Sequence, residues 1–400
     1  MAFRFTPEHL SFLSSEAAAL VDEALREQTE KYSDSLRIQT ALRKRFPGME
    51  PHYLRACLEL WQLRPRLQHK CGMHPASWCS RDTLEMASSQ ATARLHANML
   101  PAGGRILDCC SGIGSDAVHL ARHNEVLCIE ADPVTARMCR HNLRLVHARA
   151  AVLAGTAEYW APALQRGAFD AVFVDPARRD DTRRVYDAEH ASPPLSFVQR
   201  SFPLLPLLVK TAPAAALSDT SWGRLWVAHQ RECKEQLLHR GLDLPLRGVI
   251  DATSGVTWSP AGVAPPPPRE AQWLIEPGSA VILSGMVAEY LHEQEAWPID
   301  PHIAYGLSAA RPTNAPLHQS FRILRMEPYH EGRLRQAVRD LDLGPGTEIK
   351  KRGFPRTPDQ IRAGLKLSGR NNGVILIARK GDGHVMIFGE RDRAPMDESA

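Results

Sequence analysis

Residues 105–132 hold the pattern that most restricts the fold of this chain. A run over residues 105–110 that is apolar apart from Arg105 and Asp108 leads into Gly112-Ile-Gly-Ser-Asp-Ala117, then a helical stretch, then a second apolar run that ends at Glu130. This order predicts a strand, a glycine turn, a helix and a second strand, which together form a βαβ unit for a nucleotide-type cofactor. The glycine spacing alone fits a dinucleotide as well as S-adenosylmethionine.

Asp108 separates these two cofactors by charge. It comes just before the glycine turn, where a dinucleotide would place its pyrophosphate, and a carboxylate there repels phosphate. S-Adenosylmethionine has no phosphate and carries a positive amino group and a positive sulfonium, which a carboxylate attracts. The sign of the charge therefore favours S-adenosylmethionine. Glu130 closes the second strand, where a carboxylate can accept hydrogen bonds from ribose hydroxyls, and Asp132 is a second candidate for that contact.

Strand and helix patterns alternate after residue 104, which predicts an α/β fold with a Rossmann-like parallel sheet covered on both faces. The expected strands are Ile106–Leu107, Val126–Ile129, Val152–Leu153, Ala171–Val174, Leu207–Val209 and Leu225–Val227. Apolar residues at three- and four-residue intervals predict a helical region before them. Its expected helices are Ala17–Gln28, Leu36–Phe46, Pro51–Leu63 and Arg81–Met99, with a further helix start at Thr6-Pro7.

The loop after the fourth strand is a candidate methyl-acceptor site. Ligands of open parallel sheets bind at the carboxyl ends of the strands, and here the strand ends in Asp175-Pro176-Ala-Arg178-Arg179. We expect Asp175 to face the transferable methyl group and Pro176 to stiffen the loop. The arginines, with Arg183 and Arg184, suggest phosphate binding, or else a solvated charge run balanced by nearby aspartates. Lys210, at the end of the fifth strand, is a second candidate for the substrate rim, or else a surface residue.

Together these stretches resemble the class I S-adenosylmethionine-dependent methyltransferases of the bacterial group with a C-terminal THUMP-like domain. The matching segments begin at Asp108, Asp175, Val209, Glu276 and Ile349 and span most of the chain. The resemblance implies an RNA-directed methyltransferase with three parts: a helical domain or lid (1–100), the methyltransferase domain (101–310) and a THUMP-like α+β domain (311–395). The implied cofactor-binding residues are Asp108, Ser111, Gly112, Gly114, Asp116, Glu130, Ala131, Asp132, Thr156, Ala157 and Asp175, and the implied catalytic residues are Asp175, Pro176, Arg178 and Lys210.

Two departures from the expected pattern bear on the chemistry. Thr156 stands where an acidic residue that contacts adenine is expected, so its hydroxyl or Glu158 has to replace that contact. The acceptor loop has no aromatic residue after Asp175-Pro176 to stack on a base, and Tyr186 is the nearest downstream candidate. Covalent methylation of a pyrimidine carbon needs a late cysteine, and the one cysteine after Cys139 is Cys233, in a run that we expect to be helical. A base nitrogen is therefore the favoured acceptor.

Positive charge is concentrated at the carboxyl end. Residues 311–393 contain 17 Lys and Arg against 9 Asp and Glu, a formal +8, whereas the whole chain is +4. A basic module is what phosphate neutralisation requires, although a basic surface without a partner stays an alternative. The residues that we expect to contact RNA are Arg179, Lys350, Lys351, Arg352, Lys366 and Arg370. Trp273-Leu-Ile-Glu-Pro277, in contrast, is expected to belong to the catalytic part.

Composition excludes several classes. We find neither a signal peptide nor an apolar stretch long enough to span a membrane, so we expect a cytoplasmic protein. The eight cysteines form no paired C-x-x-C motif and no disulfide framework. The cluster His69, Cys71, His74 and Cys79 has looser spacing than structural zinc sites, so no metal is expected. No obligate protein partner is evident.

Three functions stay open at this stage. The first is methylation of a base, with nitrogen favoured, in structured rRNA or tRNA. The second is an RNA-binding or assembly factor that binds S-adenosylmethionine with weak or no catalysis, and the third is a small-molecule methyltransferase. The sequence does not identify the RNA, the nucleotide, the methylated atom or the oligomeric state.

Overall fold

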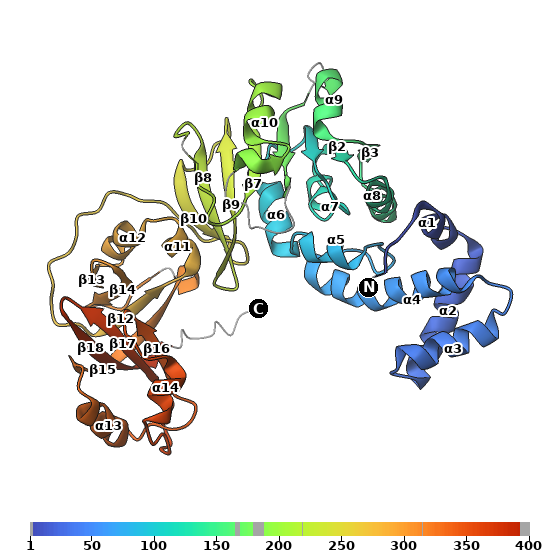
Figure 1. Cartoon of the computed structure of the whole chain (residues 1–400). Coiled ribbons are helices and arrows are strands. Elements are labelled where there is room, and N and C mark those ends of the chain that lie inside the picture. Colours follow the sequence, from blue (N-terminus) through green and yellow to red (C-terminus); the bar gives the residue numbers. More distant parts are fainter. Residues whose placement is uncertain (1–2, 165–168, 179–187, 218, 314, 393–400) are drawn as a thin grey trace. The chain divides into compact units, whose positions relative to one another are not determined.

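The computed structural model describes residues 3–164, 169–178, 188–217, 219–313 and 315–392 (Figure 1). The chain forms two compact units. The first unit is Met1–Arg224 with Gln236–Leu244, and the second is Leu225–Glu235 with Pro245–Ala400. The helical region and most of the parallel sheet thus belong to one unit.

Six helices open the first unit. They are α1 (Pro7–Leu13), α2 (Glu16–Lys31), α3 (Ser35–Arg45), α4 (Pro51–Cys71), α5 (Arg81–Met86) and α6 (Gln90–Met99). The predicted start at Thr6-Pro7 is confirmed, because Thr6 caps α1 in a capping box with His9. Helix α4 continues past the predicted end, since an internal proline removes one N–H donor but leaves the apolar face intact, and it stops at Gly72 in the left-handed region (φ 62°).

The predicted helix over residues 81–99 is two helices. The chain leaves the helical conformation after Met86, and the Ser89 hydroxyl accepts the backbone N–H of Thr92 as the N-cap of α6. Serine at this position competes with the helical hydrogen bonds, which is why the break falls here. Ser88 therefore lies in a short connection between α5 and α6 instead of inside a helix.

The sheet of the first unit has the strand order β9-β7-β4-β1-β2-β3. Its strands are β1 (Arg105–Cys109), β2 (Glu125–Glu130), β3 (Ala150–Ala154), β4 (Ala171–Val174), β7 (Leu207–Thr211) and the part of β9 (Glu232–Arg240) from Gln236 onward. All neighbouring pairs are parallel except β7 and β9. The Rossmann-like α/β prediction is confirmed, and the carboxyl ends of β1, β2, β4 and β7 meet along one edge.

Helices cover both faces of this sheet. The helices that follow the strands are α7 (Ala117–Leu120), α8 (Pro133–Leu145), α9 (Ala157–Leu164) and α10 (Leu195–Ser201), together with a 3-10 turn η1 (Ala188–His190) and a short pair of strands, β5 (Ala177–Arg178) and β6 (Ala191–Ser192). Leu107 and Val172 pack with α9 and α10 on one face. On the other face the ring of Phe173 lies 5.2 Å from that of His96 on α6. Asp108 alternates with Leu107, so it faces the α6 side.

Asn142 of α8 connects the helical region to the glycine loop. Its side-chain oxygen accepts the backbone N–H of Trp78, 2.7 Å away, and its amide donates to the carbonyl oxygens of Trp78 and Ile113, both at 2.9 Å. Asn142 is fully buried. These bonds fix the segment between α4 and α5 beside the loop that follows β1.

The second unit contains two sets of hydrogen-bonded strands. One has the order β11-β10-β8, from β8 (Gly223–His229), β10 (Arg247–Asp251) and β11 (Thr257–Trp258). The other has the order β13-β14-β12-β15-β18-β17-β16, from β12 (Trp273–Pro277), β13 (Ala296–Asp300), β14 (Ile303–Ser308), β15 (His318–Pro328), β16 (Glu348–Arg352), β17 (Val374–Lys380) and β18 (Gly383–Arg391). The helices are α11 (Ser279–Leu283), α12 (Val287–Glu293), α13 (Glu331–Asp340) and α14 (Pro358–Ala363), with a 3-10 turn η2 (Ala315–Leu317).

Two predictions about this region are wrong. The run around Cys233 is part of strand β9 and not a helix, because Gln230 and Arg231 both adopt positive φ (52° and 68°) and make a tight two-residue turn between β8 and β9. Trp273–Pro277, which we expected in the catalytic part, forms β12 and pairs with both β14 and β15. The sheet that carries the basic C-terminal segment therefore begins well before residue 311.

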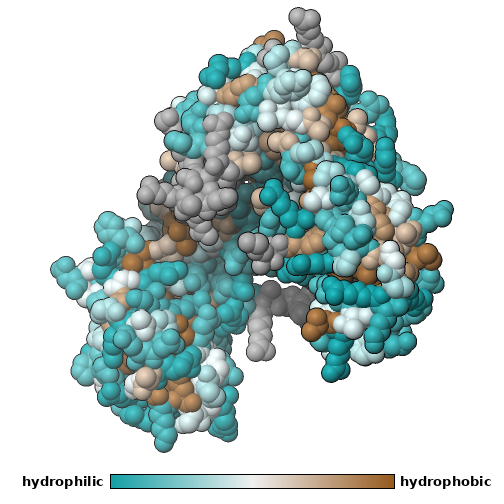
Figure 2. Space-filling model, turned by 45° about the vertical axis from the view of Figure 1, so that its right-hand side comes forward, coloured by the Kyte–Doolittle hydropathy of each residue, from teal (hydrophilic) through white to brown (hydrophobic). Residues whose placement is uncertain are grey.

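The surface is polar on the face that Figure 2 shows, with apolar side chains scattered among hydrophilic ones. Within the described ranges, none of the helices combines the length and the apolar character that crossing a bilayer requires.

Candidate active site

The glycine loop leaves β1 with three residues in the left-handed region. Cys110, Gly112 and Gly114 have φ values of 66°, 56° and 85°. A Cβ atom on Gly112 would meet no atom within 4 Å, so this glycine borders open space. A Cβ on Gly114 would lie 3.0 Å from the Sγ atom of Cys139 on α8. Gly112 thus keeps a space open above the sheet, whereas Gly114 allows the loop to pack on α8.

Asp108 is the least satisfied polar group of the site. Its side chain is completely buried, and neither carboxylate oxygen has a hydrogen-bond partner among the described residues. Burial raises the pKa of Asp108 well above its usual range, and the negative charges of Asp116 and Asp175 add to this, while the Lys210 ammonium opposes it. A buried carboxylate without partners is costly, so this position calls for a cation or a hydrogen-bond donor from outside the chain.

Glu130 lies at the end of the neighbouring strand β2. Its Oε2 atom accepts the backbone N–H of Gly112 and its Oε1 atom that of Asp132, both at 2.9 Å. Burial nevertheless raises the pKa of this carboxyl. Each carboxylate oxygen keeps a second acceptor position, so Glu130 is still able to receive hydroxyl donors. Asp132 instead caps α8, because its Oδ1 atom accepts the Thr135 N–H at 2.7 Å.

The remaining predicted cofactor residues lie along the same edge of the sheet. Ser111 is buried, and its Oγ atom lies 3.4 Å from the carbonyl oxygen of Ile129. Ala131 is exposed at the end of β2 and Ala157 is buried at the start of α9. The Thr156 hydroxyl, the candidate substitute for the missing acid, accepts the N–H of Tyr159 at 3.2 Å and so starts α9.

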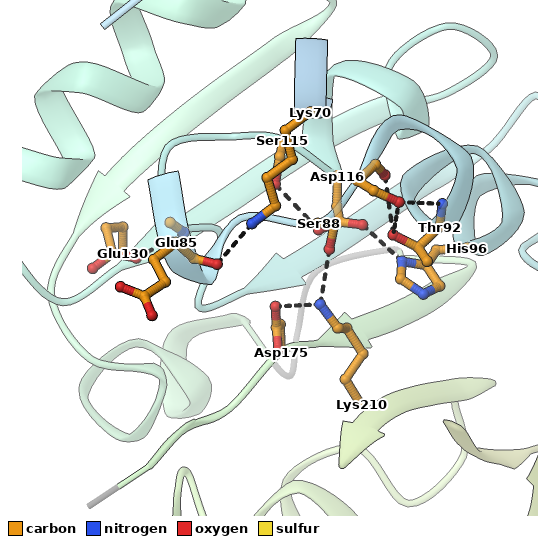
Figure 3. Close-up of polar contacts among 12 residues, drawn as sticks. Lys70, Glu85, Ser88, Thr92, His96, Ser115, Asp116, Glu130, Asp175 and Lys210 are labelled. Carbon is orange, nitrogen blue, oxygen red and sulfur yellow. Dashed lines mark hydrogen bonds and ion pairs between the residues drawn. The ribbon is translucent and has the colours of Figure 1, made fainter. Parts of the chain in front are cut away.

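Asp175 and Lys210 form an ion pair at the carboxyl ends of β4 and β7 (Figure 3). The Lys210 ammonium donates to Oδ2 of Asp175 at 2.6 Å and to the Ser88 hydroxyl at 2.8 Å. The Lys210 side chain is 10% exposed and that of Asp175 is 35% exposed. Lys210 is therefore not a surface residue, because these two acceptors draw its long side chain inward, and its place on the substrate rim stays a prediction.

The strand register brings the acids together. Cys109 of β1 is level with Val174 of β4, which is level with Val209 of β7. Asp108, Asp175 and Lys210 consequently lie at the same end of three adjacent strands, with Asp175 between the strand of the buried acid and that of the lysine. The acceptor loop and the glycine loop thus border one site.

Asp116 belongs to a second set of polar contacts in this site (Figure 3). Its Oδ1 atom lies 2.7 Å from Nδ1 of His96, whose ring is fully buried on α6. Burial alone would raise the pKa of Asp116, but the Lys210 charge and hydrogen bonds from His96 and Ser88 outweigh it and hold that pKa far below its usual range. Asp116, predicted to bind the cofactor, is thus directed toward α6 and the connection before it.

Sequence reasoning missed Ser88 and His96 as site residues. Ser88 was noted only as part of the expected lid, and His96 carried no motif. The one available signal was the four-residue spacing of Ser88, Thr92 and His96, which would place these polar side chains on one face of the helix predicted over residues 81–99. This spacing does not indicate a site until the partner residue Asp116 is known.

Several predicted residues of the acceptor loop lie outside the described part of the chain. Arg179, Arg183, Arg184 and Tyr186 are among them, and for Arg178 only the backbone, in β5, is described. Pro176 is half-buried directly after Asp175.

The predicted RNA contacts of the second unit differ in accessibility. Lys350 is 16% exposed and its ammonium lies 2.7 Å from Glu276 and 2.9 Å from Glu348, so it is not available to phosphate, contrary to our expectation. Lys351 donates to the carbonyl oxygen of Phe354 at 2.9 Å. Arg352 is exposed and lies over the Tyr305 ring. Lys366 is exposed as well, and Arg370 is 93% exposed although it pairs with Asp342.

Burial makes the described cysteines poor nucleophiles. Burial raises the pKa of Cys233 to about 12, which is opposite to what a nucleophilic thiolate needs. Burial also raises the pKa values of Cys71 and Cys79, to about 11 and 12. In the described ranges no three His, Cys, Asp or Glu side chains are grouped as metal ligands would be.

These residues fit S-adenosylmethionine. The unpartnered Asp108 carboxylate suits a ligand with positive charge, Gly112 leaves room for it, and Glu130 offers acceptors for ribose hydroxyls at the next strand end. A pyrophosphate would meet two buried acids, Asp108 and Asp116, and the partly exposed Asp175 against one lysine. The Rossmann-like sheet and this site define a class I S-adenosylmethionine-dependent methyltransferase.

Comparisons with known proteins agree with this class. The family described as conserved hypothetical protein 95 matches residues 91–187, and the THUMP domain-like family matches residues 318–391. Two Mycobacterium tuberculosis proteins, from strains CDC 1551 / Oshkosh and ATCC 25618 / H37Rv, are named uncharacterized S-adenosylmethionine-dependent methyltransferases. Each is 28% identical over 362 residues, which cover 86% of this chain and 96% of the relative.

A solved structure from Porphyromonas gingivalis W83, which carries a provisional methyltransferase name, has the same fold over 98% of this chain and 100% of its own. The TM-score is 0.75 at 21% identity. The chain is thus similar to S-adenosylmethionine-dependent methyltransferases over most of its length, and its C-terminal segment is similar to THUMP-like domains.

Proposed function

We propose that this protein transfers the methyl group of S-adenosylmethionine to a nitrogen of a base in structured rRNA or tRNA. The observation that carries the proposal is the placement of Asp175 beside Asp108 at the ends of adjacent parallel strands. In this arrangement one carboxylate serves the cationic cofactor and the other serves the acceptor. We further propose that the reaction takes place in the cytoplasm.

On the cofactor side, Asp108 would receive the amino group and the positive field of the sulfonium, and Glu130 the ribose hydroxyls. Ser111, Gly112 and Gly114 shape the loop around the ligand, and Thr156 or Glu158 borders the adenine. Bound S-adenosylmethionine supplies the electrophilic methyl group. The chain then has to hold the acceptor nitrogen in line with it.

On the acceptor side, the ionised Asp175 can accept a hydrogen bond from the amino group of a base and so orient its nitrogen. Half-buried Pro176 follows directly and limits the freedom of the loop. The Arg178-Arg179 pair continues the loop with positive charge, which suits a nucleotide phosphate. Cys233, with its raised pKa, offers no covalent alternative.

On the RNA side, the proposal rests on the THUMP-like segment and on the formal +8 of residues 311–393. Arg352, Lys366 and Arg370 are the exposed members of the predicted set, so they are our candidates for phosphate contacts. The division into residues 1–100, 101–310 and 311–395 stays part of this proposal. Because β12 pairs with β15, charge reversal is a better test than truncation at residue 311, which would remove four strands of one sheet.

The test uses RNA from cells that lack the protein. Purified protein is incubated with this RNA and S-adenosylmethionine carrying a labelled methyl group, and the labelled nucleoside is identified by mass spectrometry. Asp175→Ala should lose transfer by about 100-fold while it still binds the cofactor, and Asp108→Asn should lose both. Asp243→Asn, an exposed aspartate of the same unit, serves as the matched control.

Each other outcome identifies another function. Cofactor binding without transfer to any RNA fraction would point to an RNA-binding or assembly factor. Transfer to a small metabolite and not to RNA would point to a small-molecule methyltransferase. In both cases the proposal is wrong.

A further inference from the structure

Lys210 is the one buried cation that faces both halves of the site in the described structure. Its ammonium joins Asp175, on the acceptor side, to Ser88, in the connection between α5 and α6. Its charge also acts on Asp108 and Asp116, on the cofactor side. Figure 3 shows this lysine entering between Asp175 and Ser88 from the strand end of β7.

The Ser88 end of this contact is itself fixed. The connection that carries Ser88 leads into α6, whose His96 binds Asp116 at 2.7 Å. Ser88 hydrogen-bonds Asp116 as well, since that bond contributes to the lowered pKa of the carboxyl. Lysine has a flexible four-carbon stem, and the two acceptors that its ammonium contacts restrict its position.

We infer that Lys210, held by Ser88, is a positioning residue that fixes the carboxylate of Asp175 for the methyl acceptor. The inference rests on the proposed function, because it assigns Asp175 the acceptor side of the same site. Lys210 acts through Asp175 and does not touch the reacting atoms. The side chain of Asp175 stays 35% exposed while its Oδ2 atom is held, so the carboxylate can still meet a substrate.

Electrostatics separates this role from a merely structural one. Three acids of the described site, Asp108, Asp116 and Asp175, interact with the charge of Lys210. Replacing the lysine by methionine, which has a similar length, removes a positive charge from the surroundings of a cationic cofactor. Cofactor affinity should therefore stay the same or rise, whereas methyl transfer should fall because Asp175 loses its fixed position.

The experiment compares Lys210→Met, Lys210→Arg and Ser88→Ala with the full-length protein. S-Adenosylmethionine affinity is measured by calorimetry, and kcat and KM for RNA by labelled methyl transfer. For Lys210→Met we expect kcat to fall about 10- to 100-fold without weaker cofactor binding. For Ser88→Ala we expect a fall of about 3- to 10-fold, and for Lys210→Arg partial recovery. Lys44→Met, an exposed lysine of α3, is the control.

Two results would overturn the inference. Unchanged kcat in Lys210→Met would show that the ion pair does not position Asp175. A parallel loss of cofactor affinity and kcat, with a lower melting temperature, would show that Lys210 only maintains the fold. If the unmodified protein transfers no methyl group to any RNA, the proposed function fails and this inference with it, so the two failures are distinguished by the unmodified protein.

Discussion

The ammonium nitrogen of Lys350 lies 2.7 Å from Oε2 of Glu276, and both side chains are only 16% exposed. These residues come from β16 and β12. The same ammonium also contacts Glu348 at 2.9 Å and lies 5.8 Å from the centre of the Phe321 ring. A lysine with two carboxylates and an aromatic ring around it stabilises the sheet of the second unit and has no free charge to offer an RNA backbone.

Lys350→Met should therefore lower the stability of the second unit and leave RNA affinity nearly unchanged. Removing the lysine leaves Glu276 partly buried without its cation, at a cost of about 1–3 kcal/mol. The free energy of unfolding from urea titration and RNA binding by fluorescence anisotropy measure the two effects. The double variant Lys366→Glu/Arg370→Glu should show the opposite result, with normal stability and weaker RNA binding that depends on salt. Equal RNA affinity in both variants would contradict this assignment.

Asp108→Asn should make the protein without cofactor more stable. Burial raises the folded-state pKa of Asp108 above the unfolded value of 3.8, so the ionised form costs stability that grows as pH rises from 3.8 through the folded pKa. The neutral amide avoids this cost, and we expect a gain of about 1–3 kcal/mol at pH 7. S-Adenosylmethionine affinity should fall about 10- to 100-fold in the same variant. Thermal unfolding with and without cofactor tests the predicted gain in stability and the predicted loss of affinity. If Asp108→Asn is less stable than the unmodified protein in the absence of cofactor, the Asp108 carboxylate has a partner within the protein.

Cofactor affinity should rise with pH. A cationic ligand binds the ionised form of Asp108 preferentially, so binding strengthens as pH increases through its raised pKa. Glu130, whose pKa burial also raises, changes affinity in the same direction, whereas Asp116 is ionised throughout because His96, Ser88 and Lys210 favour its charged form. Calorimetry from about pH 5 to about pH 9 covers the range in which buried carboxyls titrate. Cofactor affinity should rise more steeply with pH in the unmodified protein than in Asp108→Asn. Identical pH profiles would be inconsistent with a role for Asp108.

The two loop glycines should respond differently to alanine. Gly112→Ala would place a methyl group in the open space beside the loop, so it should weaken cofactor binding more than it destabilises the fold. Gly114→Ala brings its Cβ within 3.0 Å of the Cys139 sulfur and should cost about 1–3 kcal/mol of stability. Adding Cys139→Ala to Gly114→Ala should recover part of that loss. Because both glycines have positive φ, alanine at either position should cost about 1 kcal/mol of backbone strain. The difference between the two variants is therefore measured relative to this common cost.

The sequence predicted best what depends on contiguous residues. The strand, glycine turn and second strand of residues 105–130 follow from local periodicity and turn chemistry, and so does the cap at Thr6. Asp108 could be singled out because its charge conflicts with phosphate wherever its oxygens point. These features need no knowledge of distant partners.

Features that depend on distant partners could not be predicted. The contact of His96 with Asp116 joins residues 20 positions apart, and that of Lys210 with Ser88 joins residues 122 positions apart. We expected Lys350 to contact RNA because its segment is basic. No local pattern reveals its partner Glu276, which lies on another strand. The turn at Gln230-Arg231 was missed since neither residue is a usual choice for positive φ.

The dependence of Asp116 on α6 sets a limit for anyone who wants to excise a minimal catalytic fragment. A fragment that starts at the first strand would keep the entire sheet but lose the imidazole and the hydroxyl that compensate this acid, and Lys210 would lose one of its two anchors. The smallest version that folds with an intact centre should therefore begin ahead of Ser88, and the cofactor half of this enzyme is not a cassette that can be transplanted without its preceding helices.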